Sequence, residues 1–116
     1  STTARLLDDG ATGLILHCAD EAHAAVLAEL DARGLRVPED VSVISVGATF
    51  DTTALPTPID SIPLVPEDSC DLAVDLALQC LSADKPEPGV RLIPPTYSPA
   101  GSVAPPRLKS SGAAAD

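Results

Sequence analysis

Apolar residues are densest between residues 41 and 46, where the sequence reads Val-Ser-Val-Ile-Ser-Val. Most of these residues are apolar and β-branched, a composition that favours an extended strand over a helix. So apolar a strand is typical of a parallel sheet whose two faces are both covered. We therefore predict a buried parallel strand at Val41–Val46.

The segment before this strand has the pattern of an amphipathic helix. Its apolar residues recur every three or four positions and form one stripe, which comprises Ala22, Val26, Leu27 and Leu30. Gly34 then suits the left-handed conformation that ends many helices. The pattern predicts a helix over Asp20–Arg33, in which the carboxylate of Asp20 caps the first turn.

A second apolar segment precedes the helix, because Gly13–Cys18 reads Gly-Leu-Ile-Leu-His-Cys. Together the three elements form a βαβ unit, whose strands are expected to be parallel and whose crossover is expected to be right-handed. Residues 2–9 end at Gly10 and indicate the last turns of a further helix. The predicted fold class is therefore α/β with a parallel sheet.

The second half of the chain is less regular. Residues 47–58 lack any periodicity and predict a loop at the carboxyl end of the second strand. Short strands are predicted at Asp60–Leu64 and Val90–Ile93. Between them, Pro66 suits the first turn of a helix that continues to Leu81.

The helix Glu67–Leu81 has apolar side chains on two of its faces. Each exposed Leu or Val loses roughly 1.5–3 kcal/mol relative to burial, so such a helix needs cover. We expect the chain to cover it by repacking or by exchanging the helix with a second copy, and a homodimer is the preferred solution. The residues that need cover are Leu72, Leu76, Leu78 and Leu81.

Composition narrows the classes of partner. The formal net charge of −10 argues against direct contact with a nucleic-acid backbone, and the near absence of aromatic residues removes a base-stacking platform. No apolar run is long enough to cross a membrane, and the sequence does not start with a basic and then apolar leader. We therefore expect a cytoplasmic protein without membrane contact.

Candidate chemistry is sparse. The three cysteines lack the CxxC spacing of zinc sites, so no metal or disulfide framework is predicted. His17 and Cys18 are adjacent in a strand and point to opposite faces, which separates a thiol from its base. We interpret Cys18 as a buried structural residue and His17 as partly exposed. Acidic residues on the helix Glu67–Leu81 are interpreted as a solvated face. Neither an enzyme nor a cofactor is predicted.

Five segments carry a family resemblance: His17–Glu21, Gly34–Val46, Pro58–Ile62, Leu92–Pro95 and Ser102. They are similar to the effector-binding core of LacI/GalR-type transcriptional regulators, which have a periplasmic-binding-protein-like (Rossmann-like) fold.

The resemblance implies that residues 1–106 are the C-terminal portion of an incomplete lobe of such a domain, followed by a flexible tail at residues 107–116. It further implies a small polar effector, sugar-like or other, a homodimer, and DNA contact only through an N-terminal domain that is missing from this chain.

In such regulators, polar residues after the strands contact the effector. Here Asp20 matches that pattern, either as a helix cap alone or as a cap that also contacts ligand. Phe50 and Asp51 lie in the loop after the next strand and are the other predicted ligand-binding residues. The chain departs from the family at Ala19 and Ala100, where the family has Asn and Arg, so a different effector, or none, is implied. A solute-binding protein of a transport system and a small α/β enzyme are the alternative functions.

The net charge of the chain leads to a prediction about DNA binding. The chain alone should not bind DNA specifically, because its net charge of −10 repels the phosphate backbone. A gel-shift titration with duplex DNA at low and moderate salt measures this. Salt-sensitive and sequence-specific binding by the isolated chain would overturn the domain assignment.

Overall fold

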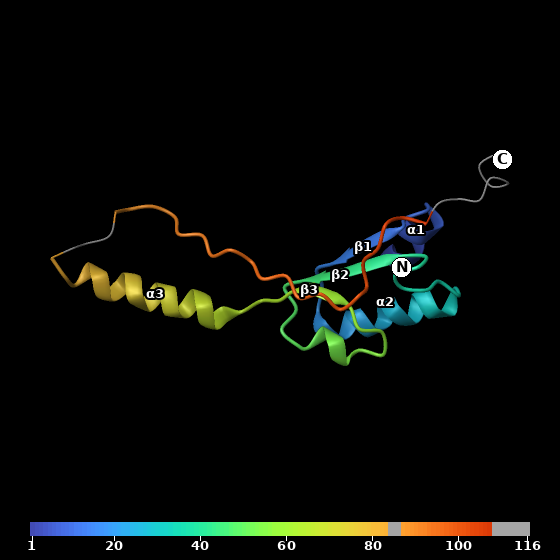
Figure 1. The fold of residues 1–116 in the computed structure, drawn as a ribbon, viewed down its shortest axis with the longest axis horizontal. Coiled ribbons are helices and arrows are strands. Elements are labelled where there is room, and N and C mark those ends of the chain that lie inside the picture. The colour runs from blue at the N-terminus through green and yellow to red at the C-terminus, as the bar shows by residue number, and fades with distance from the viewer. Residues whose placement is uncertain (84–86, 108–116) are drawn as a thin grey trace.

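The computed structural model describes residues 1–83 and 87–107 of the chain. The elements follow one another as α1 (Thr2–Asp8), β1 (Gly13–Leu16), α2 (Asp20–Ala32), β2 (Ser42–Val46), η1 (Thr52–Ala54), β3 (Asp60–Ile62) and α3 (Pro66–Cys80). They form a body, which holds the sheet with α1 and α2, and an arm made of α3 and the extended segment that returns from it (Figure 1). The tail predicted at residues 107–116 lies, from residue 108 on, outside the described residues.

The sheet confirms the predicted βαβ unit. Its three strands run in the order β1-β2-β3, and both strand pairs are parallel. In β1 and β2, Leu14 lies beside Val43 and Leu16 beside Ser45. Because β2 has a neighbour on each side, it is the central strand of the body, as its apolar composition suggests.

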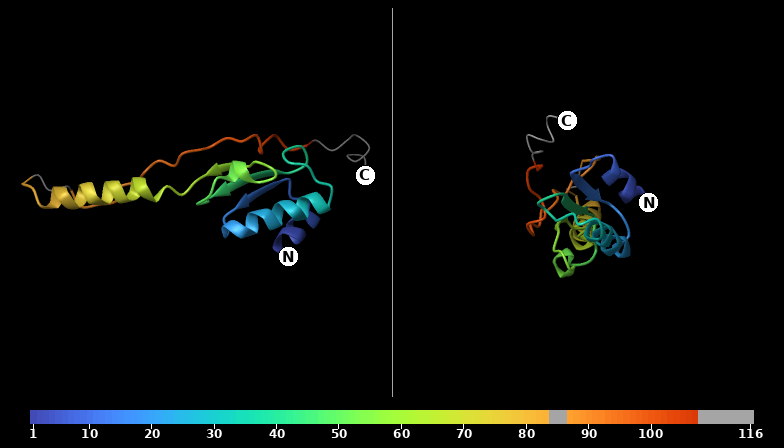
Figure 2. Two further views of the ribbon diagram at one scale, coloured as in Figure 1. Left: turned by 90° about the horizontal axis from the view of Figure 1, so that it is seen from below. Right: turned by 90° about the vertical axis from the view of Figure 1, so that its right-hand side faces the viewer.

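Only one face of the sheet is well covered. On that face the core is formed by Leu14, Leu16, Leu27, Leu30, Val41, Val43 and Ile59. Figure 2 shows α2 lying along this face. On the other face Ile15 is 74% exposed, and Ile44 is only partly buried. The prediction that both faces are covered is wrong for these residues, because none of the described helices packs over the second face.

Helix α2 presents a slightly different stripe from the predicted one. Its buried residues are His23, Leu27 and Leu30, whereas Ala22 and Val26 are half-buried. The helix is also not capped by a side chain, since its N-cap is Ala19 and Asp20 is already the first helical residue. The predicted cap at Asp20 is therefore wrong, although its negative charge still complements the helix dipole.

The arm stands away from the body. The chain extends over 70 × 29 × 24 Å, and no residue of α3 is buried. Leu78 and Leu81 are 60% and 86% exposed, so α3 does not repack against its own chain. Residues 90–93 form no strand, contrary to the prediction, because they pair with no neighbouring strand. None of the described helices is long and apolar enough to span a membrane.

A returning segment, residues 98–104, is bound to the middle of the sheet, and we call it the strap. Ser98 pairs with Ser61 of β3 in an antiparallel bridge, and the N–H of Val43 donates to the carbonyl of Ser102 over 3.0 Å. Ser42 exchanges two further hydrogen bonds with Ala104. The strap therefore extends the hydrogen bonding of β2 where β3 has not yet begun.

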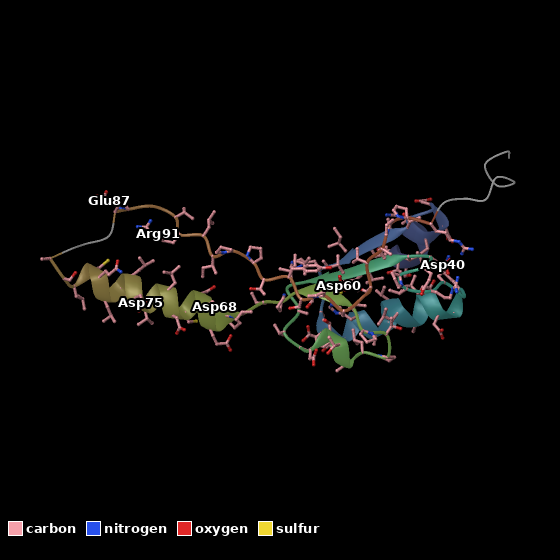
Figure 3. The ribbon with its side chains drawn as sticks, viewed as in Figure 1. Asp40, Asp60, Asp68, Asp75, Glu87 and Arg91 are labelled. Atoms are coloured by element: carbon pink, nitrogen blue, oxygen red, sulfur yellow. The ribbon has the colours of Figure 1, made fainter. Side chains whose placement is uncertain are left out.

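The carboxylate of Asp60 is the centre of this attachment. Asp60 is 3% exposed and lies where the body meets the arm (Figure 3). Its Oδ1 accepts N–H groups from Ala100 at 2.7 Å and Ser102 at 3.0 Å, while Tyr97 donates its phenol to Oδ2. Its own N–H donates to the Ser102 hydroxyl over 2.6 Å. The N–H and both carboxylate oxygens of Asp60 are thus matched by groups of the returning chain.

These contacts predict a specific acid sensitivity. Burial raises the pKa of the Asp60 carboxyl, but the N–H groups of Ser102 and Ala100 and the Ser102 hydroxyl outweigh it, so the pKa lies below its usual value. A lowered pKa in the folded state contributes stability that is complete above the unfolded pKa of about 3.9 and is lost as the pH falls through the folded pKa.

Urea unfolding of Asp60→Asn as a function of pH tests this expectation. At neutral pH the variant should lose about 1–3 kcal/mol, because buried N–H groups lose a charged acceptor. Below pH ~4 its stability should depend on pH less steeply than that of the wild type. Asp75→Asn, which removes an exposed carboxylate of α3, is the control and should keep the wild-type profile. If the free energy of unfolding fell equally steeply at acid pH in the wild type and in Asp60→Asn, the role given to Asp60 would be contradicted.

Candidate ligand site at the carboxyl ends of the strands

Polar side chains meet where β1 and β2 end. The loop after β1 (residues 17–19) and the loop after β2 (residues 47–51) emerge from the same edge of the sheet, because the strands are parallel. In open α/β sheets this edge is where ligands bind. The three residues predicted to bind a ligand all come from these two loops or from the start of α2.

Asp20 joins the two loops. Its Oδ2 accepts the hydroxyl of Thr49 over 2.7 Å, and both side chains are exposed. Asp20 lies in the first turn of α2, where the helix dipole favours a negative charge. The pair therefore presents a carboxylate and a hydroxyl to solvent, a combination that can bind hydroxyl groups of a ligand.

A second hydrogen bond ties the same loops through a histidine. The Nδ1–H of His17 donates to the carbonyl of Val46 over 3.0 Å. Next to it, Gly47 has a φ of 80°, and a Cβ at this position would lie 3.4 Å from Cε1 of His17. Glycine is thus favoured by its backbone conformation, whereas the imidazole lies at an ordinary van der Waals distance. The geometry holds the β2 loop against the end of β1.

His23 is a buried residue that contacts both loops of the site. It is 1% exposed; its Nδ1 lies 3.2 Å from the Ala19 carbonyl and its Nε2 lies 2.7 Å from the Ser45 hydroxyl. A neutral ring that donates from Nδ1 and accepts the Ser45 proton at Nε2 satisfies both contacts. The ring also meets Phe50 edge-on, with centroids 5.1 Å apart and an interplanar angle of 82°. Phe50 is positioned by this contact and stays half-buried.

Asp51 has a local role as well as a place in the loop. It caps η1 by accepting both the hydroxyl (2.6 Å) and the N–H (3.0 Å) of Thr53. The hydroxyl of Thr53 and then its N–H lower the pKa of the Asp51 carboxyl, which is exposed. Asp51 is therefore a charged group of the rim, with one oxygen engaged by its own loop.

The structure brings the predicted residues to one edge but gives each a different partner. Asp20 contacts Thr49, Phe50 contacts His23, and Asp51 contacts Thr53. Cys18 is exposed, so its interpretation as a buried residue is wrong; its Sγ lies 3.8 Å from Nδ1 of His23.

Three supporting residues were not identified from the sequence: His23, Ser45 and Thr49. A signal for His23 exists, because it precedes Leu27 and Leu30 at helical spacing and thus belongs to the buried stripe.

A serine and a histidine lie within hydrogen-bond distance of each other behind this edge. Ser45 and His23 have the spacing of a nucleophile and its base, but Ser45 is fully buried and cannot reach an external substrate. Within residues 1–83 and 87–107, no group of His, Cys, Asp or Glu could hold a metal ion.

Surface hollows lie on other parts of the chain. One, of about 330 Å³, lies between α2 and the loop after η1 and is lined by Ala24, Leu27, Ala28, Asp31, Pro56 and Thr57. Another, of about 190 Å³, lies at the base of the arm beside Leu64 and Pro94. Neither of these two hollows is lined by Asp20, Phe50 or Asp51.

Known proteins share this architecture. Residues 3–103 match the family model of the periplasmic binding protein-like domain. No curated protein matches the chain significantly. Among solved structures, a LacI family transcriptional regulator from Bifidobacterium animalis subsp. lactis is 30% identical with a TM-score of 0.74, over 92% of this chain and 39% of that one.

Two further structures agree in fold. The dimeric Lac repressor with an 11-residue C-terminal deletion gives a TM-score of 0.72 at 22% identity, over 91% of this chain and 39% of that one. A LacI family transcriptional regulator from Arthrobacter sp. FB24, in complex with lactose, gives 0.67 at 24% identity, over 88% and 38% of the two chains. The chain thus spans about two-fifths of the length of the solved structures that it matches.

Proposed function

Because the chain belongs to the periplasmic binding protein-like domain family, we propose that it is the effector-sensing and dimerising portion of a LacI/GalR-type transcriptional regulator. The observation that carries this proposal is the likeness to the Bifidobacterium regulator, which extends over 92% of this chain at 30% identity. The relatives found among solved structures are transcriptional regulators, so a binding function is favoured over catalysis. Such a regulator acts in the cytoplasm, where its operator lies.

The proposed ligand is a small polar molecule held at the carboxyl ends of β1 and β2. Support comes from the Asp20–Thr49 pair, which offers a charged acceptor and a hydroxyl at the open edge. Phe50 lies beside them and can stack on a ring, while Asp51 adds a charge at the rim. A regulator of similar fold is in complex with lactose, which makes sugar-like molecules the first class to test.

DNA is contacted, in this proposal, by a domain outside these residues. The chain itself is too acidic for that role, with 17 acidic and 7 basic residues. What it contributes is an effector site whose occupancy changes the arrangement of the body and whatever packs on the arm. A homodimer would let two DNA-binding domains read two half-sites, as symmetric operators require.

The effector site is tested by calorimetric titration of the whole regulator with lactose, galactose and glucose. For the sugar that binds, Asp20→Ala should weaken affinity about 10- to 100-fold, because a hydrogen bond to a charged group contributes about 1.5–3 kcal/mol. Asp75→Ala, on the exposed side of α3, is the matched control and should bind like the wild type.

Unchanged affinity of Asp20→Ala would remove Asp20 from the site. A panel in which no sugar binds would contradict the sugar-like class of effector. In that case the carboxylate and the neighbouring hydroxyl of this edge would have to serve another polar ligand or none.

Dimerisation of the chain is tested by sedimentation velocity at micromolar concentrations. We expect a dimer, because α3 exposes apolar side chains that a second copy can cover. Leu78→Glu should shift the equilibrium toward monomer by placing a charge on that surface. Asp71→Glu, which keeps the charge of an exposed residue, is the control. A wild-type chain that stays monomeric throughout would contradict dimerisation through α3.

A further inference from the structure

The buried imidazole of His23 is held at both of its nitrogens. His23 lies near the start of α2 and is 1% exposed, so it cannot itself reach a ligand. Its Nδ1 lies 3.2 Å from the carbonyl of Ala19, and its Nε2 lies 2.7 Å from the hydroxyl of Ser45. Ser45 is fully buried in β2, so one side of the ring is anchored to the central strand of the sheet.

The directions of these two hydrogen bonds follow from their partners. A carbonyl oxygen only accepts, so Nδ1 carries the proton and donates to Ala19. In a neutral ring Nε2 then accepts, and the hydroxyl of Ser45 donates to it. Because the two partners belong to the loop after β1 and to β2, the plane of the imidazole is fixed relative to the sheet.

The ring of Phe50 packs against this fixed imidazole. The centroids are 5.1 Å apart and the interplanar angle is 82°, which is an edge-to-face arrangement that aromatic pairs prefer. A phenyl ring has no hydrogen-bonding group that could hold it, and Phe50 lies in a loop, outside any helix or strand. The contact with His23 therefore limits the directions in which the half-buried ring of Phe50 can point.

We propose that His23 is a positioning residue of the effector site, which holds the ring of Phe50 in the orientation that stacks on a ligand. This inference rests on the proposed function, because it takes Phe50 as a ligand-binding residue. It also narrows the ligand to a molecule that has a ring with an apolar face, such as the C–H side of a sugar. A side chain that is already held in place loses less conformational entropy on binding, so affinity depends on His23 although His23 does not touch the ligand.

Two matched double variants separate this role from a general contribution to stability. His23→Leu/Ser45→Ala and His23→Phe/Ser45→Ala both remove the hydrogen bonds of the imidazole, and Ser45→Ala prevents a hydroxyl from being buried without a partner. They differ in one respect, because only the second variant keeps an aromatic ring beside Phe50. Circular dichroism and urea unfolding establish that each variant is folded.

The mobility of Phe50 can be measured without a ligand, because Phe50 is the single phenylalanine of the 116 residues. Carbon-13 NMR relaxation of the ring-labelled chain reports this mobility. We expect His23→Leu/Ser45→Ala to raise it and His23→Phe/Ser45→Ala to restore the wild-type value. In the latter variant, the resonances of Phe50 are those that disappear when Phe50→Leu is added. Ser45→Ala alone adds no bulk and should also raise the mobility, since it frees Nε2 of the imidazole.

Affinity is measured by calorimetric titration of the whole regulator with lactose, galactose and glucose. For a sugar that binds, His23→Leu/Ser45→Ala should weaken affinity about 3- to 10-fold, the effect of one aromatic contact. His23→Phe/Ser45→Ala should bind like the wild type. When Phe50→Leu is added, the two variants should bind alike, because the residue through which they act is then missing. Ser61→Ala, which removes a serine hydroxyl from the strand beside Ser45, is the control and should leave affinity unchanged.

Equal ring mobility in the two double variants would overturn the positioning role, because an aromatic ring at position 23 would then make no difference to Phe50. A rise in mobility without a loss of affinity would overturn it as well, since the orientation of Phe50 would not matter to the ligand. If the wild type bound none of the three sugars, the proposed class of effector would fail. The ring measurement needs no ligand and would still decide whether His23 holds Phe50.

Discussion

A buried carboxylate that accepts hydrogen bonds from a distant part of its own chain organises this structure. Asp60 lies at the start of the shortest strand, and its oxygens satisfy N–H groups that would otherwise be buried without a partner. Burying a charge is costly unless it is hydrogen-bonded, so this arrangement is stable only as a complete set. The strap, β3 and the base of the arm consequently depend on one another.

The candidate site is built on the same framework. The β2 loop that carries Thr49 and Phe50 is hydrogen-bonded to the exit of β3 twice, from Gly47 to Ile62 over 2.8 Å and from Leu64 to Ala48 over 3.0 Å. A ligand that displaced this loop would therefore act directly on the chain leading to α3. Backbone contacts of one loop, rather than a series of side chains, connect the candidate site to the base of the arm.

Periodic features of the chain could be predicted from the sequence. The βαβ unit and α3 follow from local apolar patterns and from glycine and proline positions, and the structure confirms both. The sequence could not show which apolar surfaces are covered by other elements. An apolar strand has the same sequence pattern whether or not a second layer packs on it. Hence the open face at Ile15 differs from expectation, whereas cover of α3 by a second copy stays a prediction.

The structure places the three candidate residues at one edge of the sheet, and their binding of a ligand stays a prediction. Asp20, Phe50 and Asp51 follow from the rule that ligands bind after parallel strands. Their partners depend on contacts across the fold: Thr49 reaches Asp20 from a position 29 residues away, and Ser102 reaches Asp60 from 42 residues away. A local pattern has no information on such pairs. Ser102 was recognised only as a matching position, and its role became apparent from burial and hydrogen bonding together.

Native-state hydrogen exchange, followed by NMR, tests most directly whether Asp60 binds the strap into the folded body. If it does, the amides of Ala100 and Ser102 should exchange as slowly as that of Val43 in β2, because all three open only with the body. The amides of residues 90–93, which form no strand, provide the reference for exchange without protection. Exchange of Ala100 and Ser102 at the rate of residues 90–93 would contradict the account, since the strap would then be an independent loop.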